Sequence, residues 1–432
     1  MTEKRIHVDY MARVEGEASL NVRVVDGEIK ELVLDVFEPP RFFQGFLVGR
    51  SYEEVPEIVS RICGICPVSH QLAAIQAIED AFGIEPSEQT KDLRRLLALS
   101  QWIQSHTLHV YFLAAPDFLG YESVLAMAED YGPVVERALK LKRLGNDLTA
   151  LIGGREVHPV TAVIKGFTSL PDEGELLAIR ERLEEARKDA QATVTLAASL
   201  EVPDFERPCE HIAVRSSEEY AIYDGRVVST EGLDIAAWDY RNHIRERHVP
   251  PAHALHSYVV GRGSFLVGPL ARVNLNREQL SDNAKAALEK VRKAKGVEFP
   301  SFNPFHGAIA RAVELVHAVD ECIKIIDRLE LVEEPISYQI KAGEGFAVTE
   351  APRGLLYHSY RINDQGIIEE ADIVSPTAHN VYNMEEDLRA FIPTVLDLPD
   401  DEATLKCETV IRNYDPCFSC SAHFLKMRIE RE

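Results

Sequence analysis

The sequence lacks any uninterrupted apolar run long enough to cross a membrane. A spanning helix needs about 20 mostly apolar residues, so we expect no span. Basic charge is also scarce, since 47 lysines and arginines stand against 70 aspartates and glutamates and the formal net charge is −23. This balance repels phosphate groups, and we therefore expect neither nucleic acid nor an anionic lipid surface as a partner.

The beginning of the sequence lacks the apolar core of a signal peptide, because residues 1–5 lead directly into a strand-like run. We therefore expect a cytoplasmic location. No Gly-x-Gly-x-x-Gly loop is present, so a nucleotide or flavin is expected on another chain. Internal repeats, low-complexity segments and clear linkers are also missing, which favours a single domain over residues 1–432.

Helical and strand-like patterns are both present, and the helical ones are longer. Asp26-Gly27 separates alternating runs at residues 19–25 and 28–36, which predicts a β-hairpin. Together these patterns predict an α+β fold, a helix-dominated body with long core helices and small peripheral antiparallel sheets. The expected helices span residues 90–113, 123–152, 173–200, 277–295 and 306–331; a similar turn signal stands at 223–226, and antiparallel strands are expected at 354–362 and 367–373.

Seven cysteines are an odd number for a framework of disulfides. Four of them form two pairs of identical spacing, Cys63-x-x-Cys66 and Cys417-x-x-Cys420, and a histidine follows each pair. In a cytoplasmic chain of this size, such pairs are typical of metal binding or catalysis. The other three stand alone: Cys209, Cys322, which we expect in the core, and Cys407.

The first cysteine pair precedes an expected helix. Pro67 suits the first turn of a helix, so Cys66 should lie at its N-terminus, where free N–H groups and the helix dipole favour a thiolate. Gly64 lets the backbone approach whatever the two sulfurs bind. His70 follows one turn later on the same face, as a ligand or a hydrogen-bonding neighbour of one.

The two pairs together supply four thiolates, a number and softness that suit zinc, iron or nickel. A structural zinc site is the plainer interpretation. However, such modules usually bring together pairs that are tens of residues apart, because the metal itself folds them. Here about 350 residues separate the pairs, and a domain of this size needs no metal staple. We therefore predict a buried metal centre for small-molecule redox chemistry.

Further motifs occur in order along the whole chain. They are Arg13-Val14-Glu15-Gly16-Glu17, the first cysteine cluster, Gly153-Gly154-Arg155-Glu156-Val157-His158-Pro159, Gly268-Pro269-Leu270-Ala271-Arg272, Glu350-Ala351-Pro352-Arg353-Gly354 and the second cysteine cluster. In this order they resemble the large, catalytic subunit of nickel–iron hydrogenases. The Pro-Arg-Phe-Phe and Cys-Pro-Val-Ser-His segments are most similar to the cytoplasmic multimeric branch, which couples H2 to NAD(P) or another soluble carrier.

The resemblance implies an oxidoreductase that cleaves H2 reversibly and heterolytically to protons and electrons. Nickel would be bound by Cys63, Cys66, Cys417 and Cys420. Cys66 and Cys420 would also bridge to an iron that carries carbon monoxide and cyanide ligands. Polarisable thiolates suit a redox-active nickel.

The resemblance also assigns roles to other residues near the metals. Glu15 would relay protons outward. Arg353 would lie over the metals, where a fixed positive charge orients the substrate, and Asp117 and Asp415 would hold it in place. His70 would form a hydrogen bond near the bridging sulfur or a cyanide.

An accessory magnesium site is implied at Gln44, the backbone carbonyl of Ile373 and His423. The family usually has a glutamate where this sequence has Gln44, and an amide oxygen brings no negative charge. We therefore expect weak or absent magnesium. Many relatives are cut after the terminal histidine, whereas residues 424–432 follow His423 here.

Electrons would have to leave through partner chains. The resemblance implies a small iron–sulfur subunit together with diaphorase-type or other electron-transfer subunits, with iron–sulfur clusters and flavin only on those partners. Two alternatives remain at this point: the related quinone-site subunit of respiratory NADH:quinone reductase, which lacks the full cysteine set, and a scaffold with a structural zinc and no hydrogenase activity.

Overall fold

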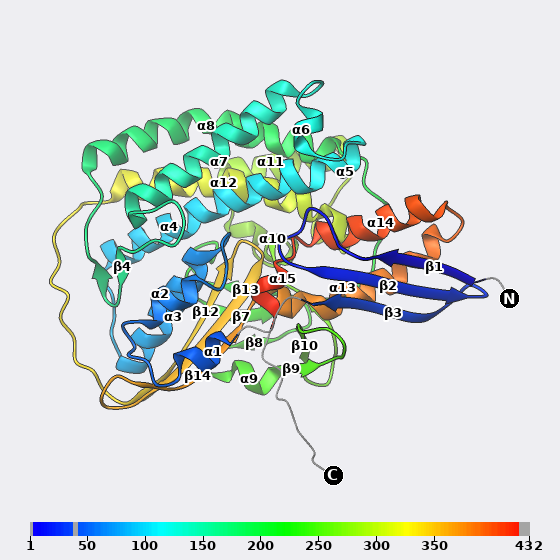
Figure 1. The fold of residues 1–432 in the computed structure, drawn as a ribbon. Coiled ribbons are helices and arrows are strands. Elements are labelled where there is room, and N and C mark those ends of the chain that lie inside the picture. Colours follow the sequence, from blue (N-terminus) through cyan, green and yellow to red (C-terminus); the bar gives the residue numbers. More distant parts are fainter. Residues whose placement is uncertain (1–2, 38–41, 423–432) are drawn as a thin grey trace, which may run out of the picture.

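The protein is described by a computed structural model that covers residues 3–37 and 42–422. About half of these residues are helical, and small, mostly antiparallel sheets pack beside the helices, which confirms the predicted α+β class. Figure 1 shows the long helices packed together on one side of the molecule. They are α4 (Glu88–Thr107), α7 (Gly132–Gly153), α8 (Glu173–Ser199), α11 (Asp282–Lys295) and α12 (Gly307–Arg328).

Two of the predicted helices differ in their boundaries. Residues 123–152 form two helices, α6 (Val124–Met127) and α7, instead of one. Pro133 stands in the first turn of α7 and has no N–H with which to continue a preceding helix, so a new helix begins there. The helix expected from residue 277 begins only at α11, because the side chain of Ser281 caps it.

The N-terminal sheet consists of β1 (Glu3–Val8), β2 (Ala18–Val25) and β3 (Glu28–Val36) in that order, all antiparallel. The hairpin predicted at Asp26-Gly27 is confirmed. Both turn residues have positive φ, 51° and 82°, as a tight hairpin turn requires. One face of β2 is buried against the second core cluster of the molecule.

The hairpin expected at residues 223–226 is wrong. β7 (Arg226–Ser229) does begin there, and it pairs antiparallel with β6 (Glu210–Arg215). However, the last residue of β6, Arg215, pairs with the first residue of β7, Arg226. The connection between the two strands is therefore the ten-residue segment 216–225 and not a tight turn at 223–226. The sheet is completed by β8 (Asp234–Ile235) and β11 (Phe265–Leu266).

The sheet of β12 (Gly343–Ala351), β13 (Gly354–Ile362) and β14 (Ile368–Val374) connects the helical layer to the cysteine clusters. The antiparallel pair predicted at its last two strands is confirmed. Helix α3 (Pro67–Phe82) packs against β12 and β13. The largest core cluster contains all four cysteines of the two pairs, so the site is built into the interior.

The remaining elements complete the fold. Among them, α15 (Phe418–Ser421, red) lies in the middle of the molecule in Figure 1. No helix of residues 3–37 and 42–422 is both long and apolar enough to span a bilayer. The others are α1 (Phe43–Leu47), α2 (Val55–Ser60), a π-helix at Leu108–Ala114, α5 (Ala115–Leu119), β4 (Ala162–Val163), β5 (Gly166–Phe167), α9 (Tyr240–His243), β9 (Ile244–His248), β10 (Leu255–Val259), α10 (Pro269–Asn276), α13 (Pro376–Phe391), α14 (Asp400–Asn413) and short 3₁₀ turns.

Candidate metal centre

The N-terminal cysteine loop is held mainly by its own backbone. Pro67 is the first residue of α3 and Cys66 is its N-cap, as the sequence predicts. The Sγ atom of Cys63 accepts hydrogen bonds from the backbone N–H groups of Ile65 (3.3 Å) and Cys66 (3.0 Å). These donors stabilise negative charge on the Cys63 sulfur.

The C-terminal cysteine loop is held by residues far away in the sequence. The backbone N–H of Cys417 donates to Thr377 Oγ1 at 2.9 Å. Glu15 contributes backbone bonds on both sides of the cysteine: its N–H donates to the carbonyl of Pro416 (3.4 Å), and its own carbonyl accepts from the N–H of Phe418 (2.9 Å). The N-terminal segment around Glu15 therefore holds the C-terminal cysteine loop in place.

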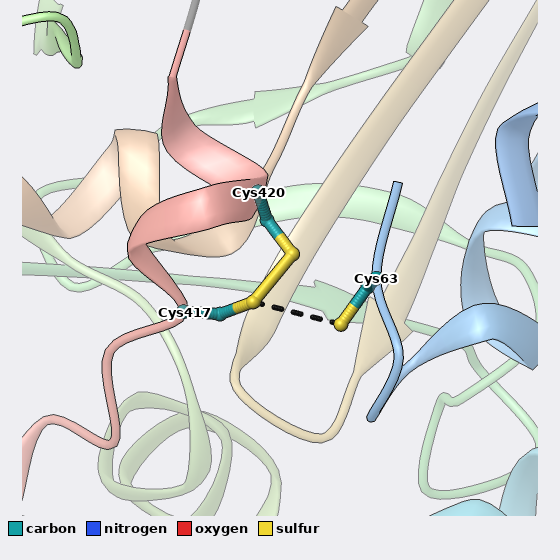
Figure 2. A group of neighbouring side chains, drawn as sticks. All are labelled: Cys63, Cys417 and Cys420. Atoms are coloured by element: carbon teal, nitrogen blue, oxygen red, sulfur yellow. Dashed lines mark hydrogen bonds between the residues drawn. A yellow bond between two sulfur atoms is a disulfide. The ribbon is translucent and has the colours of Figure 1, made fainter. Parts of the chain in front are cut away.

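The sulfurs of the two loops meet in the interior. Cys63 Sγ lies 3.5 Å from Cys417 Sγ although 354 residues separate them, and Cys417 forms a disulfide with Cys420 (Figure 2). Potential ligand atoms within 4.8 Å of one another form two overlapping groups, Cys63 with Cys417 and Cys420, and Cys66 with His70 and Cys420. All of these residues are buried.

This donor set fits a soft metal centre. Reduction of the disulfide makes all four sulfurs available as ligands, and His70 lies beside them. Burial opposes ionisation of Cys63, but the hydrogen bond from Cys66 and the charge of Arg353 outweigh it and lower the pKa of Cys63. The pKa of Cys66 is raised, chiefly by its hydrogen bond to Cys63 and then by burial. Cys63 is therefore the more acidic thiol of this pair, and a bound cation would favour the thiolate form of both sulfurs.

Glu15 lies directly beside the sulfur of the C-terminal loop. Its Oε2 atom is 2.9 Å from Cys417 Sγ and accepts a hydrogen bond from the backbone N–H of Ser419 at 3.2 Å. The hydroxyl of Ser419 donates to Oε1. Glu15 is only partly buried, so it bridges the buried sulfurs and the outer part of the molecule. Ser419 stands inside the second cysteine motif, but the sequence gives no separate signal for it.

Arg353 and Asp415 form a buried ion pair. The guanidinium donates from Nε to the Asp415 carbonyl (2.7 Å) and from Nη2 to its Oδ1 atom (3.0 Å). Burial raises the pKa of Asp415, and the charge of Arg353 opposes that rise. Nη1 of Arg353 has no hydrogen-bond partner among the described residues, so one buried donor remains for a ligand of the centre.

Asp117 does not hold Arg353, which corrects the expectation from the resemblance. Its Oδ2 atom accepts from Arg412 Nε (2.7 Å) and its Oδ1 atom from Arg412 Nη2 (3.0 Å) and from Arg13. Helix α5 places Asp117 against α14, and the buried Arg412 needs a carboxylate there. The arginine of the Arg13–Glu17 motif is the sequence signal for this pairing, because it contacts the same carboxylate.

His70 is fully buried, and burial lowers its pKa to about 3. Its Nδ1 atom lies 3.1 Å from Nε2 of His358, a residue for which the sequence gave no signal, and His358 Nδ1 lies 2.6 Å from the Tyr360 hydroxyl. The Nε2 atom of His70 has no hydrogen-bond partner in the described part of the chain. The imidazole is thus fixed at one end and open at the other.

The residues expected at the accessory metal site are connected without a metal. The side-chain amide of Gln44 donates to the carbonyl of Ile373 at 3.2 Å and lies 3.4 Å from Asp372 Oδ1. Asp372 also accepts from Arg241 through both carboxylate oxygens. His423, the third residue expected here, lies outside the described residues.

Comparisons with known proteins agree over nearly the whole chain. The family described as nickel-dependent hydrogenase matches residues 41–132 and 262–423. The alpha chain of sulfhydrogenase 1 from Pyrococcus furiosus is 36% identical over 98% of both chains. A vhu chain of the F420-non-reducing hydrogenase from Methanocaldococcus jannaschii is 30% identical over 88% of this chain and 97% of its own. Among solved structures, an NAD+-reducing [NiFe]-hydrogenase in the H2-reduced state aligns with a TM-score of 0.87 and 27% identity, over 97% of this chain and 99% of the other.

Proposed function

We propose that this chain, which belongs to the nickel-dependent hydrogenase family as a large subunit, cleaves H2 reversibly and heterolytically into protons and electrons. One observation carries the proposal: four buried sulfurs from opposite ends of the sequence converge beside a carboxylate and an arginine. This is the combination that charge separation in H2 requires. The core cluster that contains the cysteines extends from Leu47 to Cys420, in keeping with one domain.

Cys63, Cys66, Cys417 and Cys420 would bind nickel, and Cys66 and Cys420 would also bind an iron with carbon monoxide and cyanide ligands. When bound, the nickel–iron centre supplies the site at which H2 is polarised and its electrons are taken up. The thiolates keep the charge of the centre low, because each brings one negative charge into an interior that disfavours isolated cations.

Glu15 would receive the proton and move it outward. Its Oε2 atom is 2.9 Å from Cys417 Sγ, which is within reach of a direct transfer from that sulfur. The Ser419 hydroxyl donates to the second oxygen, so the proton can be accepted on one oxygen while the other stays bonded. Partial exposure of Glu15 then allows release toward solvent.

Arg353 would orient H2 and the cyanide ligands from above the metals. Its charge is held by Asp415 on one side, and its free Nη1 donor is available on the other. Burial of the guanidinium keeps water away from it, which strengthens the field that it exerts at the centre. His70, fixed by His358, would donate or accept at the bridging sulfur.

Electrons would leave through a small iron–sulfur subunit, then through further electron-transfer subunits to a soluble carrier such as NAD(P), in a cytoplasmic heteromultimer. Among the described residues, the groups of His, Cys, Asp and Glu that could hold a metal all contain cysteines of the two pairs, and Cys209, Cys322 and Cys407 belong to none of them. The chain itself therefore has no second cysteine group there for a cluster. Among its relatives are hydrogenases named for NAD+ reduction and others named as not reducing F420.

The accessory magnesium would be weakly bound or absent. The Gln44 amide donates to the Ile373 carbonyl, so a hydrogen bond connects two groups that a cation would otherwise bridge. The guanidinium of Arg241 already neutralises the neighbouring Asp372. Metal analysis after dialysis should find little magnesium in the native protein and about one equivalent in the Gln44→Glu variant; a full equivalent in the native protein would contradict this.

The decisive experiment is elemental analysis combined with infrared spectroscopy of the matured complex. We expect nickel and iron together, infrared bands from metal-bound carbon monoxide and cyanide, and H2-dependent reduction of an artificial dye. Zinc alone would support a structural site, and the absence of all three metals would support the quinone-site relative. Either result would overturn the proposed function.

A further inference from the structure

Arg272 is fully buried and all of its N–H groups are hydrogen-bonded. Nε and Nη2 donate to the two oxygens of Glu314, each at 2.7 Å. Nη1 donates to Glu350 Oε2 (2.8 Å) and to the carbonyl of Ala351 (3.0 Å), and Nη2 donates also to the carbonyl of Pro352 (2.9 Å). Five donors therefore meet five acceptors, the full capacity of a guanidinium.

The backbone acceptors of Arg272 immediately precede Arg353. The two segments also touch through their backbones. A Cβ atom on Gly268, at the start of α10, would lie 2.7 Å from the carbonyl oxygen of Arg353, and one on Gly354 would lie 2.8 Å from the nitrogen of Gly268. Both glycines also have positive φ, 113° and 136°. The two motifs therefore interlock with no room for side chains at these points.

The guanidinium of Arg272 is itself held rigidly. Its Cζ atom lies 4.2 Å from the ring centroid of Trp102, whose indole N–H donates to the carbonyl of Glu350 at 3.2 Å. Glu314 also accepts from the Tyr220 hydroxyl at 2.6 Å. The clamp is thus anchored in α4 and α12, which belong to the long helical layer.

Arg353 has far fewer constraints of its own. Only Asp415 bonds to its guanidinium among the described residues, and Nη1 remains free. With a single side-chain partner, the orientation of the Arg353 guanidinium depends on how firmly its backbone is held. We propose that Arg272 is the positioning residue of Arg353: it holds the carbonyls of Ala351 and Pro352 so that the Arg353 guanidinium projects over the cysteine sulfurs. This inference rests on the proposed function.

The test is a double-mutant cycle on kcat for H2 oxidation, with Arg272→Lys, Arg353→Lys and the double variant. A lysine at 272 cannot satisfy five acceptors. We expect Arg353→Lys to lower kcat by about 100-fold, as loss of one aimed donor does, and Arg272→Lys to lower it by about 10-fold or more with nickel content unchanged. If Arg272 acts through Arg353, the kcat of the double variant should be no more than about 2-fold below that of Arg353→Lys. A difference of that size is within the usual error of additivity for two independent substitutions.

A matched control is Arg94→Lys. Arg94 is equally buried and pairs with both oxygens of Glu79, but it does not contact residues 350–354. In the metal-free chain, Arg272→Lys should speed amide hydrogen exchange in residues 350–354, whereas Arg94→Lys should not. This second measurement needs no metal and no H2, so it separates failure of the clamp from failure of the proposed function.

The inference would be overturned if the losses in kcat of Arg272→Lys and Arg353→Lys multiplied in the double variant. It would also be overturned if amide hydrogen exchange in residues 350–354 were equally fast in Arg272→Lys and Arg94→Lys. If Arg272→Lys yields no folded protein, Glu314→Gln replaces it. Glu314 accepts two of the Arg272 hydrogen bonds. Glutamine offers one acceptor oxygen and no negative charge in place of the carboxylate, so it should loosen the clamp, and this effect should again vanish in the Arg353→Lys background. An effect of Glu314→Gln that persists there would also overturn the inference.

Discussion

The two cysteine loops have the same spacing but are stabilised in different ways. In the N-terminal loop, the Cys63 sulfur is bonded by the N–H groups of the next residues, and Cys66 starts a long helix. In the C-terminal loop, the short helix α15 follows Cys417; Thr377 accepts from the N–H of Cys417, and the Glu15 backbone bonds to Pro416 and Phe418 on either side of it. One loop is shaped locally, and the other by residues 40 and about 400 positions away.

This difference suggests how the centre is completed. The hydrogen bonds of the Cys63 sulfur span only two or three residues, so they need no distant partner. The bonds of the C-terminal loop need Thr377 and Glu15, which the folded core must bring beside it. Glu15 is one of these partners and its carboxylate lies beside Cys417 Sγ, so the contacts that hold this loop also place the carboxylate.

The largest expected effect comes from removing one sulfur from either loop. Under the proposed function, Cys63→Ser and Cys417→Ser would replace a soft nickel ligand by a hard one. Both variants should lose nickel, and activity should fall by more than about 100-fold, the largest loss typical of changes to residues that only support metal ligands. Nickel analysis and H2 oxidation check this. Cys322→Ala, buried in the same core cluster, should retain nickel. A serine variant that keeps nickel and activity would remove its loop from the centre.

A smaller effect is expected from Glu15→Gln, which changes only the C-terminal side. Glutamine keeps the shape and can still accept from Ser419, but it cannot take up a proton. We expect kcat to fall by about 10²–10⁴-fold, the range for a lost general base, with nickel retained. Turnover and nickel content measure this, and Glu17→Gln in the same segment is the control. Unchanged turnover would assign the proton to another group.

The smallest effects compare the supports of the two loops directly. Thr377→Val leaves the Cys417 N–H unbonded and should cost about 1–3 kcal/mol of stability, the penalty for a buried unpaired donor. Pro67→Ala in the other loop should cost less than Thr377→Val. It frees the backbone, worth about 0.4–1 kcal/mol, and removes part of a buried ring, but it breaks no hydrogen bond of the loop. Denaturant unfolding measures both.

The control for these stability changes is Thr409→Val, whose hydroxyl donates only to a carbonyl in its own helix. It should cost less than Thr377→Val. A larger loss of unfolding free energy in Pro67→Ala than in Thr377→Val would contradict the distinction between a locally shaped loop and a loop supported by distant residues.

Much of the fold and part of the site could be predicted from neighbouring residues. Asp26-Gly27 specified its hairpin because a turn needs only its own dihedral angles. Pro67 specified a helix start for the same reason. Residues 223–226 carry a similar turn signal, yet the strand that pairs with β7 lies before a long connection. The residues of the turn alone do not show that β6 is the strand that pairs with β7.

The sequence by itself identified the candidate ligands, two cysteine pairs of identical spacing, and the motifs that contain Glu15, Arg272 and Arg353. Only the tertiary structure decided their partners. It paired Asp117 with Arg412 rather than Arg353, and it placed the Arg272 guanidinium on the backbone before Arg353. The physical reason is that a buried charge is stabilised by whichever opposite charge or dipole the packed core brings within hydrogen-bonding distance, and distance along the chain does not determine that neighbour.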